Sequence, residues 1–299
     1  MRKFLPAVAL LVLLMSAGAA RASCTWTSNP TNINFGTYSV FGGTNLTGTS
    51  TFQFNCTART TVTVSLSRGT ANSYTPRGMP RTTAPTTPLL PYNVFDDAAN
   101  TIIWGDGTGG SNDDTVTAGN GGTTFTGTAY GTLFAGADVQ AGTYLDTITV
   151  LLAWAGGNAS KTFTVSATVS TTCSVSTVAV SFGAYDPVAA NAATPLDANG
   201  TVNVLCTMGT PITVLLDLGQ HASGTTRRML SGAANFLNYE IYNNSGRTVI
   251  WNTVNTVSGT STSKNTPVSG GLTAYGRIPA GQDVTMGAYA DALLVTVNY

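Results

Sequence analysis

Few side chains in this 299-residue sequence are of the kinds that carry out covalent chemistry. Its single histidine, His221, lies two positions before Ser223, and a histidine beside a serine could form part of a hydrolytic triad. The sequence lacks the Gly-x-Ser-x-Gly motif that positions such a nucleophile in many hydrolases. The surroundings of His221 are instead typical of a solvated turn. We therefore predict no catalytic residue and no enzyme activity.

Carboxylates and cysteines are the other groups that could bind a ligand. Residues 106–114 contain three aspartates among glycines, which suggests calcium, but the spacing of an EF-hand loop is lacking. The four cysteines form no Cys-x-x-Cys pair, and only one histidine could accompany them, so a zinc site is not expected. We predict neither a metal nor a cofactor.

The N-terminus has the organisation of a secretory signal. It begins Met1-Arg2-Lys3, continues with an apolar run from Phe4 to Met15, and reaches Ala20-Arg21-Ala22, which fits the small-x-small pattern of a signal peptidase site. The apolar run is short for a membrane span, although an N-terminal anchor is the alternative. We expect residues 1–22 to be a signal peptide and the chain to be secreted through the periplasm to the cell surface.

The overall composition excludes two further classes of protein and favours β-structure. Charged residues make up 9% of the chain and the formal net charge is zero. This balance argues against a nucleic-acid partner, which requires a basic surface, and against intrinsic disorder, which accompanies high charge and low hydrophobicity. The abundance of threonine, valine and glycine suits strands and turns.

One pattern occurs twice along the chain. The matched elements keep their order, and they include Phe35-Gly36-Thr37-Tyr38 with Phe182-Gly183-Ala184-Tyr185, and Trp104 with Trp251. In a secreted chain an even number of cysteines suggests disulfides, and four cysteines allow three pairings. The repeat favours two of the possible bonds, each worth about 3–4 kcal/mol by closing a loop: Cys24–Cys56 and Cys173–Cys206.

Within each copy, apolar and polar residues alternate over short stretches. Examples are 62–66 and 148–152 in the first copy and 212–216 and 293–297 in the second. Short alternating stretches between glycine-rich turns predict β-sandwiches. We therefore predict an all-β chain of two tandem domains, residues 23–170 and 171–299.

Each copy resembles a spore coat protein U domain. The resemblance is carried by the two cysteines, Phe-Gly-x-Tyr, an Arg-x-Met at Arg77 and Arg227, the tryptophan, and a closing Gly-x-Tyr-x-Asp that ends at Asp146 and Asp291. Members of this family are similar to pilins and adhesins of archaic chaperone–usher pili. The resemblance implies an incomplete immunoglobulin-like sandwich. A periplasmic pilus chaperone would complete it first and, after the outer-membrane usher, a strand of the next pilin subunit.

The two copies end differently. The first continues into residues 162–169, where apolar residues alternate with polar ones and predict a strand with one buried face: Phe163, Val165, Ala167 and Val169. The second copy stops at Tyr299 without an equivalent stretch. We expect the C-terminal domain to lack its last strand and to receive one from another chain by donor-strand complementation.

The residues before the first cysteine add a second asymmetry. After signal cleavage only Ser23 precedes Cys24, so this chain would receive a strand and donate none. Such a subunit is expected at the tip of a fibre.

Attachment residues are expected in loops of the N-terminal domain, because loops carry binding sites and exposed apolar groups mark contact surfaces. The candidates flank a glycine pair at 42–43 and the Pro/Thr-rich loop 80–88, and they are Val40, Phe41, Met79 and Leu89. The alternative is that these side chains pack beneath their own loops.

These features predict a secreted structural and adhesive subunit at the tip of a chaperone–usher pilus, attaching cells to a host or abiotic surface in biofilm formation. A stand-alone secreted coat-like protein is the first alternative, and neighbouring genes for a chaperone and an usher would favour the pilus. A secreted hydrolase is the second alternative. Unchanged adhesion and no detectable hydrolysis after substitution of His221 would dismiss it.

Overall fold

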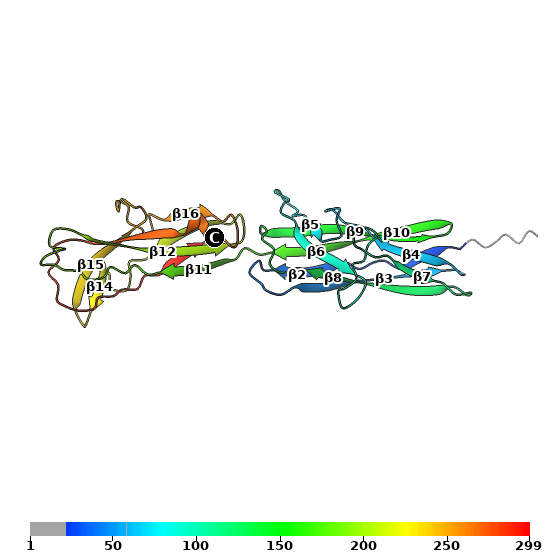
Figure 1. The fold of residues 1–299 in the computed structure, drawn as a ribbon, viewed down its shortest axis with the longest axis horizontal. Helices are drawn as coiled ribbons and strands as arrows, with labels where there is room; N and C mark the ends of the chain where they lie inside the picture. Colours follow the sequence, from blue (N-terminus) through cyan, green and yellow to red (C-terminus); the bar gives the residue numbers. More distant parts are fainter. Residues whose placement is uncertain (1–21, 58) are drawn as a thin grey trace, which may run out of the picture.

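A computed structural model of the chain describes residues 22–57 and 59–299 as two β-sandwiches. We call them the N-terminal sandwich, strands β1 to β10, and the C-terminal sandwich, strands β11 to β18. Figure 1 shows the two placed end to end. The expected signal peptide lies outside the described residues, apart from its last position.

Two five-stranded sheets form the N-terminal sandwich. The first has the order β1-β3-β8-β6-β5, which are Cys24–Ser28, Leu46–Cys56, Thr123–Leu133, Leu90–Phe95 and Arg77–Met79. The second has the order β2-β10-β9-β4-β7, which are Ile33–Tyr38, Gly157–Val169, Gly142–Trp154, Thr61–Leu66 and Asp114–Thr117. All neighbours are antiparallel except β10 and β2, which run parallel.

The core lies between the sheets because apolar residues occupy alternate positions of the strands. On β9, Ile148, Val150 and Leu152 are buried, and each side chain of this size contributes about 1.5–3 kcal/mol. Trp104 lies between the sheets and donates its indole N–H to the Val64 carbonyl at 3.0 Å. In the C-terminal sandwich, Trp251 donates to Val214 in the same way, also at 3.0 Å.

A disulfide closes the same corner of each sandwich. Cys24–Cys56 joins β1 to β3, and Cys173–Cys206 joins β11 to β12. In both cases the two cysteines are register partners across an antiparallel pair. The bonds therefore hold the first strand of each repeat in place.

The C-terminal sandwich repeats the first sheet but only part of the second. Its first sheet has the order β11-β12-β17-β15-β14, which are Cys173–Val178, Leu196–Cys206, Leu272–Ile278, Asn235–Tyr242 and Arg227–Ser231. Its second sheet has three strands in the order β16-β13-β18, which are Val257–Thr260, Pro211–Leu216 and Val295–Asn298. A short 3-10 turn, η1, spans Val268–Gly270. Among the described residues, no strand takes the places of β10 and β2.

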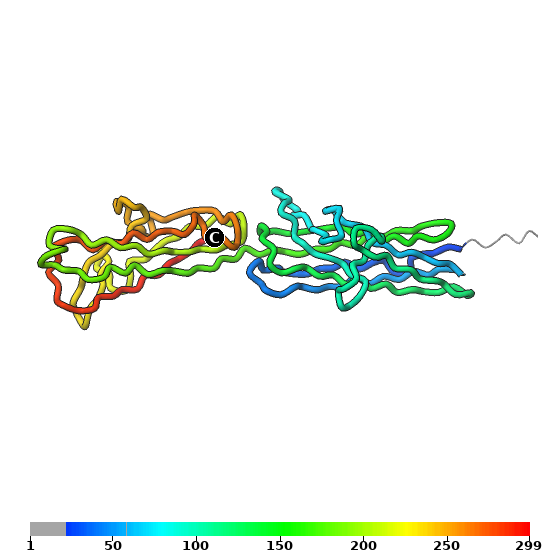
Figure 2. The backbone as a smooth tube through the Cα atoms, in the orientation of Figure 1, coloured from blue at the N-terminus to red at the C-terminus, as the bar shows by residue number. Residues whose placement is uncertain are grey.

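The two sandwiches are joined by more than their covalent link. Figure 2 shows the chain passing once between them, through residues 170–172. The Asp138 carboxylate of the N-terminal sandwich accepts hydrogen bonds from the Ser263 hydroxyl at 2.6 Å and the Lys264 N–H at 3.0 Å. The Lys264 ammonium donates to the Val40 carbonyl at 2.6 Å. These three hydrogen bonds link the two sandwiches at their junction.

We expect Asp138→Ala to loosen this junction, because the variant removes the acceptor of both hydrogen bonds from the C-terminal sandwich. Small-angle X-ray scattering should then report a broader distribution of interatomic distances, while both sandwiches stay folded. Asp113→Ala, which removes an exposed carboxylate away from the junction, is the control. Identical scattering curves for the two variants would contradict the prediction.

Candidate functional site

Strand β10 completes the N-terminal sandwich. It pairs with β9 along its whole length and with β2 near its end, where Val165 lies opposite Ile33 and Val169 opposite Tyr38. The side chains expected to face the core are all buried, at 0–2% exposure: Phe163, Val165, Ala167 and Val169. The strand is longer than the alternation of residues 162–169 indicates, since it begins at Gly157.

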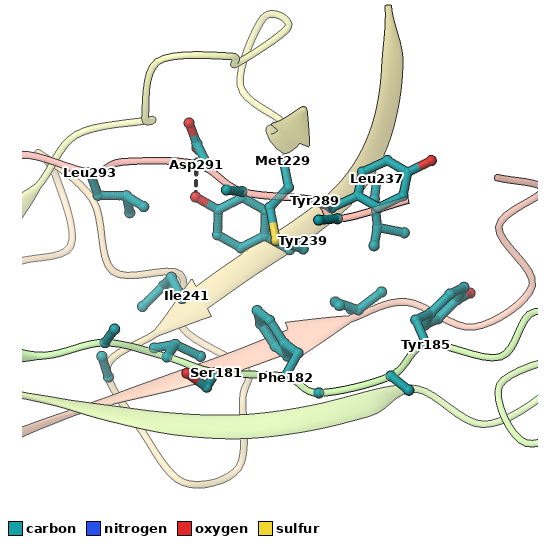
Figure 3. A pocket seen from close by; sticks show the side chains of 18 of the residues that line it. Ser181, Phe182, Tyr185, Met229, Leu237, Tyr239, Ile241, Tyr289, Asp291 and Leu293 are labelled. Atoms are coloured by element: carbon teal, nitrogen blue, oxygen red, sulfur yellow. Dashed lines mark hydrogen bonds between the residues drawn. The ribbon is translucent and has the colours of Figure 1, made fainter. Parts of the chain in front are cut away.

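The C-terminal sandwich has a groove where β10 would lie. Figure 3 shows Phe182 and Tyr185 on one wall and Tyr289 and Leu293 on the other, with Tyr239 between them. The groove has a volume of about 990 Å³. No strand of the described chain enters it, so both walls keep unpaired backbone edges.

The walls of the groove repeat the surroundings of β10. Val180, Phe182 and Tyr185 correspond to Ile33, Phe35 and Tyr38 in the sequence repeat. The opposite wall and floor correspond equally well, as the pairs Met229 and Met79, Tyr239 and Tyr92, Tyr289 and Tyr144, and Leu293 and Ile148. The residues of the N-terminal sandwich are buried at these positions, whereas those of both groove walls are only partly buried. The groove therefore has the lining of a core without its central strand.

An aspartate accepts a hydrogen bond from a tyrosine at the equivalent place in both sandwiches, and it is buried as Asp146 but only half-buried as Asp291. The Asp291 carboxylate accepts hydrogen bonds from the Tyr239 hydroxyl at 2.7 Å and the Gln220 N–H at 3.0 Å. Asp146 similarly accepts from the Tyr92 hydroxyl at 2.7 Å, and from Thr70. Burial, strengthened by the hydrogen bond to the carboxylate, raises the pKa of Tyr239. Tyr239 stays protonated and, through its hydrogen bond, holds the wall segment that carries Asp291. The aspartate of the repeated Gly-x-Tyr-x-Asp therefore has a structural role.

A glycine makes room for each of these carboxylates. Gly69 has φ +69°, and a Cβ added there would lie 2.2 Å from an Asp146 oxygen. We expect Gly69→Ala to lower the unfolding free energy by about 2–5 kcal/mol, combining left-handed strain with lost hydrogen bonds. Gly136→Ala is the control, because Gly136 has φ +83° with nothing within 4 Å of the added Cβ. Equal losses in denaturant unfolding of the two variants would contradict the prediction.

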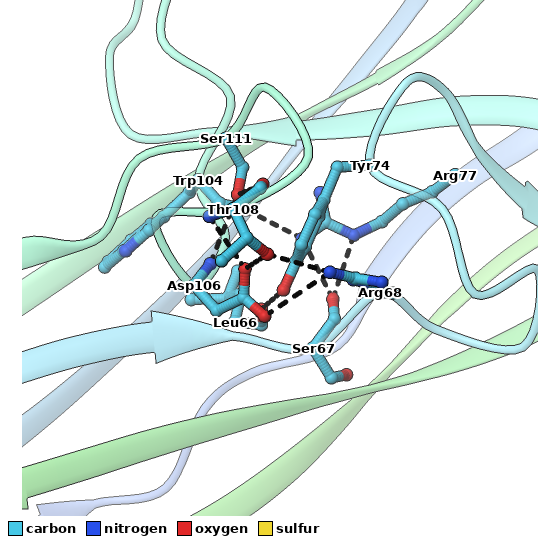
Figure 4. Close-up of polar contacts among 9 residues, drawn as sticks. All are labelled: Leu66, Ser67, Arg68, Tyr74, Arg77, Trp104, Asp106, Thr108 and Ser111. Carbon is cyan, nitrogen blue, oxygen red and sulfur yellow. Dashed lines mark hydrogen bonds and ion pairs between the residues drawn. The ribbon is translucent and has the colours of Figure 1, made fainter.

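The Arg-x-Met of the repeat places a fully buried arginine in each sandwich. Arg77 donates hydrogen bonds to the Ser67 carbonyl at 2.9 and 3.1 Å, to the Trp104 carbonyl at 2.7 Å and to the Asn93 side chain at 2.8 Å. Its guanidinium lies over the Tyr74 ring, as Figure 4 shows. Burial lowers the pKa of Arg77. The sequence repeat marks this residue, but its structural function depends on carbonyls from distant segments.

Of the three aspartates in residues 106–114, Asp106 belongs to the turn beside Arg77, whereas Asp114 begins β7. The Asp106 carboxylate accepts hydrogen bonds from Thr108, which lower the pKa of Asp106, and it faces Arg68 at 3.9 Å (Figure 4). In the described ranges, no three histidine, cysteine or acidic side chains are grouped to hold a metal. The same ranges contain no helix with the length and apolarity of a membrane span.

Two of the candidate attachment residues are placed wrongly by the sequence analysis. Val40 and Met79 are buried at 1% and 0% exposure, because Val40 packs into the core of the N-terminal sandwich and Met79 lies on β5. Leu89 is half-buried and Phe41 is 39% exposed. The loop holding Val40 and Phe41 faces the C-terminal sandwich through Lys264, so it lies at the junction and not at the far end.

The far end of the N-terminal sandwich is formed by other loops. They follow β3, join β7 to β8, and join β9 to β10, and Figure 1 shows these strands reaching the end away from the C-terminal sandwich. Their described residues are mostly small or polar, and Arg59 contacts Asn120 there. None of the four candidate attachment residues lies in these loops, because which loops share one end depends on the fold and is not visible in the sequence.

Two tandem immunoglobulin-like sandwiches, the second with an open groove, define a pilin-type two-domain chain. The chain belongs to the Spore Coat Protein U domain family, whose model matches residues 10–151 and 159–296. It is 31% identical to Protein U of Myxococcus xanthus over 129 residues, which are 40% of this chain and 71% of that protein.

A solved structure with a similar fold is the CsuC–CsuE chaperone–tip adhesion subunit pre-assembly complex of archaic chaperone–usher Csu pili from Acinetobacter baumannii. The match covers 93% of this chain and 100% of that chain, with a TM-score of 0.51 and 17% sequence identity. The similarity concerns the fold of the two sandwiches.

Proposed function

We propose that this chain is a secreted, cell-surface subunit of a chaperone–usher pilus, whose C-terminal sandwich is completed by a strand of another protein. The observation that carries the proposal is the groove between residues 180–185 and 287–294, lined like the surroundings of β10 but without a strand. Strand addition to an open sheet edge is an established mode of recognition.

The groove would be filled by two partners in succession. A periplasmic chaperone would cover the apolar walls before assembly, because exposed sheet edges and apolar surfaces promote aggregation. At the outer-membrane usher, a strand of the next pilin subunit would replace it. Membership of the Spore Coat Protein U domain family and the fold shared with a chaperone-bound adhesion subunit support this order.

We place the subunit at the tip of the pilus. The N-terminal sandwich is closed by its own β10, so among the described residues only the C-terminal sandwich has a groove for a partner. The loops at the far end of the N-terminal sandwich would then face the surroundings of the cell. We propose these loops as the attachment surface for host or abiotic surfaces in biofilm formation.

The proposal is tested by co-purification with the chaperone from the periplasm. We expect Val180→Asp to reduce the recovered chaperone at least about tenfold, because a charge in an apolar groove costs more than 1.4 kcal/mol unless it is paired. Val175→Asp is the matched control, since Val175 lies exposed on β11 of the same sandwich and outside the groove. Equal recovery with both variants would overturn the proposal and favour a stand-alone coat-like protein.

A further inference from the structure

The Pro/Thr-rich loop between β5 and β6 is a feature of the N-terminal sandwich that strand addition does not explain. Its crown, Thr82-Thr83-Ala84-Pro85-Thr86-Thr87-Pro88, contains seven consecutive exposed residues. Figures 1 and 2 show this loop standing out from the side of the N-terminal sandwich near the junction. The corresponding strands of the C-terminal sandwich, β14 and β15, are joined by only three residues, 232–234. The loop is therefore an addition specific to the N-terminal sandwich.

The base of the loop is firmly held. Arg81 donates hydrogen bonds outward to the Gln140 side chain at 2.6 Å and the Ala141 carbonyl at 3.1 Å, and back to the loop carbonyls of Thr83 and Ala84. The Thr82 N–H donates to Thr143 of β9 at 2.9 Å. The crown is thus presented from a fixed position on a rigid sheet.

The threonine hydroxyl groups of the crown are exposed and have no hydrogen-bond partner in the described part of the chain. In the described part of the chain, the side chains of Thr82, Thr83, Thr86 and Thr87 make no hydrogen bond. Threonines on the strands differ, since Thr124 and Thr126 accept hydrogen bonds from Asn55 and Gln53 at 3.1 Å. The crown lacks apolar side chains larger than alanine and proline, so it does not have the composition of an apolar contact surface.

We propose that this crown is a site of O-glycosylation. Segments rich in threonine and proline are typical acceptors of O-linked sugars, because they are extended and open to a transferase. The Thr Oγ1 would attack the anomeric carbon of a sugar carried on a diphosphate. The new C–O bond forms as the bond from that carbon to the phosphate oxygen breaks, the electron pair leaves with the diphosphate, and the hydroxyl proton passes to a base of the transferase.

The position of the loop suits such a modification. The crown lies on the side of the N-terminal sandwich, away from the groove of the C-terminal sandwich and from the far-end loops. Sugars there would obstruct neither strand addition nor attachment. They would also hydrate a chain in which charged residues are only 9% and the formal net charge is zero.

Mass spectrometry of the full chain, purified from the cells that produce it naturally, tests the proposal. We expect an intact mass above that of the processed polypeptide by whole sugar residues, and electron-transfer fragmentation should place them on the peptide that begins at Thr82. A variant with Thr82, Thr83, Thr86 and Thr87 replaced by alanine should lose the added mass and keep its melting temperature. As a control, Thr124→Ala with Thr126→Ala should retain the added mass.

Two results would overturn the proposal. One is an intact mass equal to that of the polypeptide alone, and the other is sugar confined to residues outside 82–88. Both readouts come from the natural chain, so they do not depend on the folding of any variant or on the pilus assignment.

Discussion

A copy of residues 155–169 joined directly to Tyr299 is expected to stabilise the C-terminal sandwich by about 3–5 kcal/mol. The three large apolar side chains of the copied strand would each contribute about 1.5–3 kcal/mol on burial in the groove, and ordering the strand opposes part of that gain. No extra linker is needed. Val295 and Val297 pair with β13 as Val150 and Leu152 pair with β4, so Tyr299 corresponds to Trp154 at the start of the β9–β10 turn.

Hydrogen exchange followed by mass spectrometry reports on the backbone protection of each sandwich individually. The backbone of residues 287–294, which belongs to no strand in the structure, should become protected in the extended chain. The control carries the same extension with the copies of Phe163 and Val165 replaced by aspartate, and it should show no added protection. If the intact extension leaves these residues as exchangeable as in the natural chain, the groove does not accept a β10-like strand.

Arg77→Met is expected to lower the unfolding free energy of the N-terminal sandwich by about 3–5 kcal/mol. The change leaves the buried carbonyls of Ser67 and Trp104 without these donors, at about 1–3 kcal/mol each. It also removes one of two hydrogen bonds to the Asn93 side-chain oxygen, which keeps the bond from the Val94 N–H. Loss of so many partners outweighs the desolvation that the uncharged side chain avoids.

Arg68→Met provides the comparison for this variant. Arg68 also lies over the Tyr74 ring, but its side chain is 37% exposed and its contact with Asp106 is 3.9 Å long. Interactions of exposed charges contribute about 0–1 kcal/mol. Denaturant unfolding should therefore give a much smaller loss for Arg68→Met, and similar losses would show that the buried hydrogen bonds of Arg77 are not the main source of stability.

Strong periodicity made most of the fold predictable. Residues 162–169 alternate so regularly that a strand with one buried face was the only consistent arrangement, and the repeated elements implied two copies of one fold. The start of β10 at Gly157 could not be predicted, because residues 157–162 include no large apolar side chain. They become a strand by pairing with β9, which is a tertiary effect.

The parts that sequence could not supply depend on how the sheets meet. Val40 lies two positions before the glycine pair at 42–43, and Met79 lies between a glycine and a proline, a pattern that fits an exposed loop as well as a buried strand end. Their burial is decided by packing in the core of the N-terminal sandwich, which brings together residues distant in the sequence. The buried position of Arg77 likewise requires carbonyls brought together from three segments, and no local pattern encodes such a convergence.

The position of β10 has a mechanical consequence. This strand runs directly into the three residues that lead to β11, so tension along the molecule enters the N-terminal sandwich through its C-terminal end. Hydrogen bonds to β9 and β2 lie across the direction of pull on both sides of the strand. They are therefore loaded together in shear and cannot be unzipped one at a time. A strand held in the groove of the C-terminal sandwich would resist extraction by the same geometry.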